Sequence, residues 1–91
     1  MKVRYTPRAY DDLDDIYNYL DKHLSDTAQL VKALTKRRIA WLADFPLMAP
    51  ETDEPGVREL TIARYPYKVY YELAGDEVWI LHIRHTSRKE W

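Results

Sequence analysis

Apolar side chains recur with helical spacing through the first half of the chain. A short alternating stretch at 2–5 predicts a strand. Thr6 can then cap a helix, and Pro7 suits its first turn. The apolar positions that follow lie on one helical face: Ala9, Leu13, Ile16, Tyr17, Leu20 and Leu24. Aspartates fill most of the other side, where a solvated surface is the simplest interpretation.

A second helix with two apolar rows is predicted after an interruption at 23–27. It should run to about Phe45 and end before Pro46. One row is Ala28, Val31, Thr35, Ile39 and Leu42, and the other is Leu30, Leu34, Trp41 and Phe45. One row can face a sheet, while the other packs on the first helix or forms a docking surface. We therefore consider both burial and partner binding for Leu30, Leu34 and Trp41.

Period-two alternation replaces helical spacing in the second half of the chain. After a loop at 46–56, strands are predicted at 57–62, 67–73 and 78–85. Their short connections imply an antiparallel meander. The order strand, helix, helix, strand, strand, strand predicts a single α+β domain (β-α-α-β-β-β) spanning residues 1–91. Its N-terminal helical hairpin should pack on one face of a small antiparallel sheet and leave the other face open.

Composition excludes several kinds of protein. The sequence has no cysteine, which removes disulfides, thiol catalysis and thiolate metal sites. No apolar stretch approaches the roughly 20 residues of a membrane span, and no apolar leader is visible, so a cytoplasmic protein is expected. The net charge of −1 argues against a dedicated nucleic-acid binder, which usually carries a basic excess.

Two of the three histidines, two arginines and a lysine lie within ILHIRHTSRKEW at 80–91. On a regular strand, His82 and His85 point to opposite faces and do not converge on one substrate unless a bulge intervenes. Two histidines at this spacing, with no acidic pair or cysteine nearby, do not make a metal site, and no cofactor is expected. For metal-independent RNA cleavage, the available side chains are Arg58, Arg64, His85 and Arg88.

The order and spacing of these motifs resemble ParE-type toxins of the ParE/RelE toxin–antitoxin superfamily over essentially the whole chain. The family's first helix typically shows Ala, Leu and Ile on one face, as in TPRAYDDLDDIYNYL. Its second helix ends in an apolar residue and a Leu before Pro, here Ile39, Leu42 and Pro46. The three meander strands match as GVREL, YPYKVYYEL and VWILHIRHTSR.

The resemblance implies a small bacterial toxin that is neutralised, in a hetero-oligomer, by an antitoxin encoded beside it. ParE-like members are associated with poisoning DNA gyrase, and RelE-like members cut mRNA on the ribosome. The near-neutral charge and the lack of a convergent acid–base pair favour a gyrase inhibitor, which is not an enzyme. A RelE-like endoribonuclease and an inactive interaction module of the same fold remain alternatives.

The resemblance also assigns expected roles to particular residues. Arg58 is expected to brace the start of the meander. The candidates for facing the target are Arg64, His85, Arg88 and Trp91, and the candidates for binding the antitoxin are Tyr10, Leu30, Leu34 and Trp41.

Overall fold

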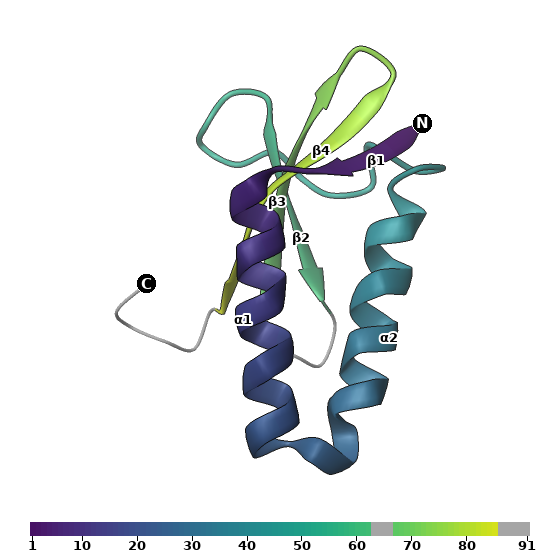
Figure 1. Cartoon of the computed structure of the whole chain (residues 1–91). Helices are drawn as coiled ribbons and strands as arrows, with labels where there is room; N and C mark the ends of the chain where they lie inside the picture. Colours follow the sequence, from purple (N-terminus) through teal and green to yellow (C-terminus); the bar gives the residue numbers. More distant parts are fainter. Residues whose placement is uncertain (63–66, 86–91) are drawn as a thin grey trace.

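A computed structural model of the chain describes residues 1–62 and 67–85 (Figure 1). Its elements are β1 (Lys2–Tyr5), α1 (Pro7–His23), α2 (Ser25–Trp41), β2 (Val57–Ile62), β3 (Tyr67–Ala74) and β4 (Glu77–His85). This order confirms the predicted α+β class. Three predicted site residues, Arg64, Arg88 and Trp91, lie outside the described residues. Neither α1 nor α2 is long and apolar enough to cross a membrane.

The strands form one sheet in the order β1-β4-β3-β2. β2, β3 and β4 make the predicted antiparallel meander. β1, however, pairs with β4 in parallel, from Lys2↔Glu77 to Tyr5↔Ile80, so the sheet is mixed and not wholly antiparallel. Parallel neighbours need a long connection between them, and here both helices and two strands separate β1 from β4 in the sequence.

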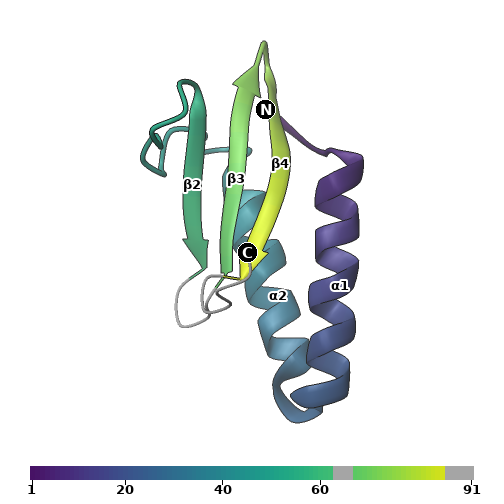
Figure 2. The same ribbon diagram turned by 90° about the vertical axis from the view of Figure 1, so that its left-hand side faces the viewer.

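Both helices cover the same face of the sheet, as Figures 1 and 2 show from two directions. α1 packs on β4, and α2 packs against β2. The core between the layers contains Ala9, Ile16, Leu20, Ala28, Val31, Ile39, Leu42, Leu60, Ile62, Tyr67, Val69, Tyr71, Val78, Ile80 and Ile83. The first predicted row of α2 is therefore buried. Thr35 fits this row because its hydroxyl donates to the carbonyl of Val31 at 2.8 Å.

The helix ends depart from the periodic pattern at two places. Leu24, predicted on the buried face of α1, is 48% exposed, because the chain leaves the helix there with φ −137° and ψ 45°. α2 ends at Trp41 and not near Phe45. The backbone N–H groups of the next three residues, beginning with that of buried Leu42, donate to carbonyls three positions back, so the last turn tightens.

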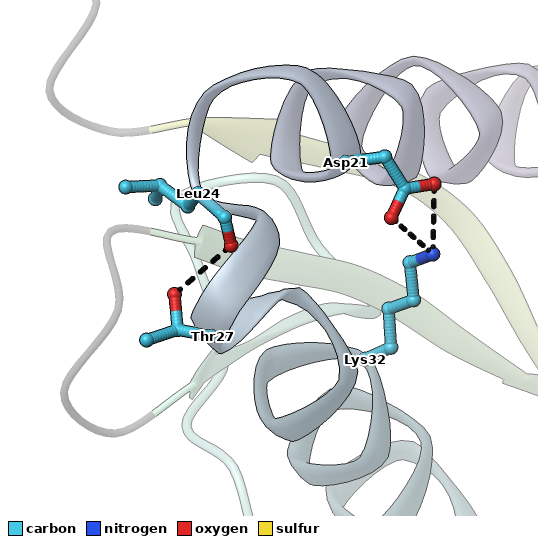
Figure 3. Close-up of polar contacts among 4 residues, drawn as sticks. All are labelled: Asp21, Leu24, Thr27 and Lys32. Atoms are coloured by element: carbon cyan, nitrogen blue, oxygen red, sulfur yellow. Dashed lines mark hydrogen bonds and ion pairs between the residues drawn. The ribbon is translucent and has the colours of Figure 1, made fainter.

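The connection between the helices is held by local contacts (Figure 3). The hydroxyl of Thr27 donates to the carbonyl of Leu24 at 3.3 Å, and the Thr27 N–H donates to the same oxygen at 2.9 Å. One turn further, the Lys32 ammonium lies 2.8 Å and 3.0 Å from the two carboxylate oxygens of Asp21. An exposed pair of this kind adds about 0.2–1 kcal/mol, so core burial dominates the packing of the hairpin.

α1 protects the edge of β4 where β1 ends. The Thr6 N–H donates to the carbonyl of Ile80 at 3.0 Å, and the Thr6 hydroxyl donates to the carbonyl of Leu81 at 2.7 Å. The same hydroxyl oxygen caps α1 by accepting from the Ala9 N–H at 3.1 Å. Further along the helix, a carboxylate oxygen of Asp12 accepts from the Ile83 N–H at 2.9 Å. Beyond the end of β1, groups at the start of α1 thus form the hydrogen bonds that a neighbouring strand would otherwise make with the edge of β4.

Asp12→Ala is expected to lower the free energy of unfolding by about 1–3 kcal/mol, because the N–H of buried Ile83 loses its acceptor. Asp12→Asn keeps an oxygen acceptor and should cost less. Asp14→Ala, on the exposed side of α1, is the matched control. Urea denaturation measures all three, and equal losses in Asp12→Ala and Asp14→Ala would contradict this role for Asp12.

Candidate functional site

A bulge in β4 precedes both histidines of the strand. The pairing with β3 shifts between Tyr70↔His82 and Tyr71↔Ile80, which leaves Leu81 as the extra residue. Because the bulge comes before His82, the alternation from His82 to His85 is regular. The two histidines therefore lie on opposite faces of the sheet, as predicted.

The environments of the two histidines differ accordingly. The ring of His85 lies 5.1 Å from that of Tyr67 and 6.4 Å from that of Tyr19 in α1, so His85 belongs to the face that the helices cover. The ring of His82 stacks on Tyr70 at 4.5 Å with an interplanar angle of 16°, on the face without helices. The two imidazoles do not form an acid–base pair.

Polar side chains gather around His82 on this uncovered face. We call Glu59, Lys68, Tyr70, His82 and Arg84 the open-face cluster. Cross-strand pairing aligns Glu59 with Tyr70, Tyr70 with His82, and Lys68 with Arg84. The Lys68 ammonium lies 3.2 Å from the Glu59 carboxylate. Burial, followed by the hydrogen bond to Glu59, raises the pKa of the Tyr70 hydroxyl, which keeps it protonated near neutral pH.

Sequence reasoning favoured His85 and missed this cluster. The alternation that places Lys68 and Tyr70 on one face was visible in the sequence. The pairing of Tyr70 with His82 depends on the position of the bulge at Leu81, for which the local sequence gives no sign. A regular register would have placed Leu81, and not His82, opposite Tyr70.

His82 favours its neutral form. Its Nδ1 is buried and has no hydrogen-bond partner among the described residues. Burial first, and then the positive charge of Arg8, lower the pKa of His82 below its ordinary value of 6.5. The carboxylate of Asp12 acts in the opposite direction but does not reverse the shift.

This lowered pKa predicts a loss of stability in mild acid. As pH falls below about 6.5, unfolded His82 takes up a proton more readily than folded His82, so the free energy of unfolding should decrease down to the lowered pKa. Urea midpoints at about pH 7.5 and about pH 5.5 measure the effect. His82→Phe, which can still stack on Tyr70, should show a smaller decrease. Equal decreases in both proteins would contradict the prediction.

The structure separates the described members of the predicted RNA-cleaving cluster. Arg58 pairs with Tyr71 and His85 with Tyr67, which places them about 13 Å apart along the sheet at a rise of about 3.3 Å per residue. The Arg58 guanidinium instead donates to the carbonyl of Ala49 at 2.6 Å, and so braces the loop before the meander. Among residues 1–62 and 67–85, no three side chains are grouped as metal ligands.

The second apolar row of α2 lies largely at the surface. Leu30 is 53% and Trp41 is 43% exposed, and Leu34 is half-buried. Eleven residues separate Leu30 from Trp41, which is three turns or about 16 Å, so both lie on one side of the helix. We call Leu30, Leu34 and Trp41 the α2 stripe. The Arg38 guanidinium lies 5.3 Å from the centre of the Trp41 ring and steadies it.

Tyr10, the remaining candidate for antitoxin binding, is separate from this stripe. It lies near the start of α1, is 58% exposed, and its ring stacks on that of Tyr5 at 5.2 Å. The structure therefore presents an apolar ridge on α2 and an isolated aromatic pair at the start of α1.

Comparison with known proteins agrees with this fold. A solved structure described as the chromosomal ParDE TA system from P. aeruginosa superposes with a TM-score of 0.82 at 27% identity, covering 94% of this chain and 96% of that one. A Sinorhizobium fredii protein named "Putative toxin Y4kP" is 32% identical over 90 residues, covering 99% of this chain and 92% of the relative. The family model described as "ParE toxin of type II toxin-antitoxin system, parDE" matches residues 3–90. The chain belongs to the ParE toxin family of type II toxin–antitoxin systems.

Proposed function

We propose that this ParE-type toxin stops bacterial growth by binding DNA gyrase in the cytoplasm, and that a cognate antitoxin holds it inactive. The observation that carries the proposal is the match to the ParE toxin family over residues 3–90. The sheet supports inhibition by binding, because its two histidines lie on opposite faces and offer no convergent acid and base. His85 remains a candidate for contacting the target, as do Arg64, Arg88 and Trp91 beyond the described residues.

The α2 stripe is the proposed binding surface for the antitoxin. Exposed apolar side chains spaced along one side of a helix fit an amphipathic segment that lies against them. Because the stripe and the open-face cluster lie on different layers of the domain, an antitoxin on α2 and a target on the sheet would contact different residues.

Expression of the chain alone in a bacterium tests this function. Growth should stop, with induction of the SOS response and broken chromosomal DNA, and co-expression of the antitoxin encoded beside the toxin gene should restore growth. Translation arrest without DNA damage would instead identify a RelE-like ribonuclease. No growth defect in the host would remove both toxin activities and leave an interaction module.

A ribonuclease is the second candidate, and the open-face cluster favours it. His82 is biased toward the neutral form that a general base requires, and Lys68 and Arg84 lie close by as cations. In that case, purified protein would cleave mRNA on the ribosome and lose this activity in His82→Ala. Retention of cleavage in His82→Ala would exclude the open-face cluster as the catalytic site.

A further inference from the structure

The segment that follows α2 is held firmly against the sheet. The hydroxyl of buried Tyr71 in β3 donates to the carbonyl of Pro46 at 2.9 Å. The Arg58 guanidinium in β2 donates to the carbonyl of Ala49, whose side chain is buried. The backbone of β2 continues this contact, since the Glu59 N–H donates to the carbonyl of Pro50 at 3.0 Å. The backbone from 46 to 50 is thus fixed by two strands.

Between these anchors and just before them, the chain carries large apolar side chains at the surface. Phe45 is 62%, Leu47 is 64% and Met48 is 38% exposed. We call Trp41, Phe45, Leu47 and Met48 the Phe45 patch. The Phe45 N–H donates to the carbonyl of Trp41 at 2.8 Å, so Phe45 lies one turn beyond Trp41 on the same side. The Met48 N–H donates in turn to the carbonyl of Phe45 at 3.2 Å.

The patch therefore extends the α2 stripe, because Phe45 lies one turn beyond Trp41 on the same side. Because the backbone that carries these side chains is already anchored, little backbone conformational entropy is lost when a partner covers them. A run of such side chains from Leu30 to Met48 is the kind of surface that monomeric proteins rarely leave uncovered.

The segment that carries the patch is acidic in sequence, although the guanidinium groups of Arg38 and Arg58 lie beside Trp41 and the carbonyl of Ala49. Residues 44–54 contain four acidic side chains and no lysine or arginine. All four are exposed, and none forms an ion pair with a described residue: Asp44, Glu51, Asp53 and Glu54. Positive charge on a partner that lies along this segment complements its carboxylates.

From this continuity and charge we infer that the antitoxin segment covering the α2 stripe extends over the Phe45 patch, and that its residues at that end are apolar side chains flanked by lysine or arginine. The inference rests on the proposed binding of a cognate antitoxin to α2. Beyond that binding, the inference specifies that the antitoxin segment continues from α2 toward residues 45–48 and that basic side chains flank its apolar end. The partner therefore contacts both the helical hairpin and the loop that is anchored to β2 and β3.

The apolar part of the inference is tested by measuring binding of the full-length antitoxin encoded beside the toxin gene. Phe45→Ser/Leu47→Ser should weaken binding at least about 10-fold, because two exposed apolar contacts are lost. Leu73→Ser, at an exposed apolar position on β3, is the matched control and should leave the affinity within about twofold. Circular dichroism confirms that each variant is folded.

The charge is tested with a matched pair of double reversals. Asp53→Lys/Glu54→Lys should slow association about 10-fold at low salt, and the difference should shrink as salt rises. Asp14→Lys/Asp15→Lys, on the exposed side of α1, makes the same change in net charge and should slow association much less.

Three results would overturn the inference. Equal effects of the two double reversals would show that only net charge matters. Unchanged antitoxin affinity in Phe45→Ser/Leu47→Ser would show that the antitoxin does not contact the patch, and would leave the proposed function intact. Loss of growth inhibition with unchanged antitoxin affinity would assign the patch to the target. If the unaltered chain does not bind the antitoxin at all, the proposed function fails as well.

Discussion

Tyr71→Ala is expected to lower the free energy of unfolding by about 3–5 kcal/mol, the usual cost of truncating a large aromatic side chain in a core. Tyr71 is 0% exposed, and among the described residues its side chain is the largest that is fully buried. It lies in β3 between Arg58 of β2 and Ile80 of β4, and its hydroxyl holds the loop after α2 through the carbonyl of Pro46. A domain of this size has about 5–15 kcal/mol of stability in total, so the loss is a large share.

Guanidinium denaturation of matched variants checks this expectation. Tyr71→Phe removes only the hydroxyl and should cost about 0.5–1.5 kcal/mol. Tyr70→Ala, one residue away on the uncovered face, should cost less than Tyr71→Ala because Tyr70 is only half-buried. If the two alanine variants lose the same stability, the placement of Tyr71 in the core is wrong.

The second large effect is expected at the α2 stripe. Leu30→Asp/Trp41→Ala should weaken antitoxin binding at least about 100-fold, or about 2.8 kcal/mol at about 1.4 kcal/mol per tenfold change. Trp41 is the kind of side chain that dominates interfaces, and an aspartate at Leu30 would bring an unpaired charge into the contact. Both positions are exposed in the free toxin, so the fold should persist.

Isothermal titration calorimetry with the antitoxin measures this loss of affinity. The two single variants, Leu30→Asp and Trp41→Ala, show how much of the loss each substitution causes. Leu73→Asp introduces the same charge at an exposed apolar position outside α2 and serves as the control. Tyr10→Ala tests separately whether the antitoxin also reaches the start of α1. Unchanged affinity in the α2 double variant would place the antitoxin on another surface.

Local patterns in the sequence account for most of the fold. The meander strands begin and end close to the predicted residues, because strict alternation and short turns leave few other registers. α1 begins as predicted, with Thr6 at its cap. The buried row of α2 was recognisable as well, including Thr35, whose hydroxyl is satisfied within the helix.

The features that were missed depend on contacts between distant segments. The parallel pairing of β1 with β4 joins residues more than seventy positions apart, which no local pattern encodes. The early end of α2 coincides with the tightened turn after Trp41, and the exposure of Leu24 follows from the turn between the helices. The stacking of His82 on Tyr70 has the same origin, since the bulge at Leu81 sets the register that pairs these two residues.

Inhibition of DNA gyrase is tested most directly with purified components. The chain, added to gyrase and relaxed plasmid, should block supercoiling and accumulate cleaved DNA, and an equimolar amount of the antitoxin should reverse both effects. Full supercoiling activity in the presence of the chain, together with ribosome-dependent mRNA cleavage that His82→Ala abolishes, would contradict gyrase as the target.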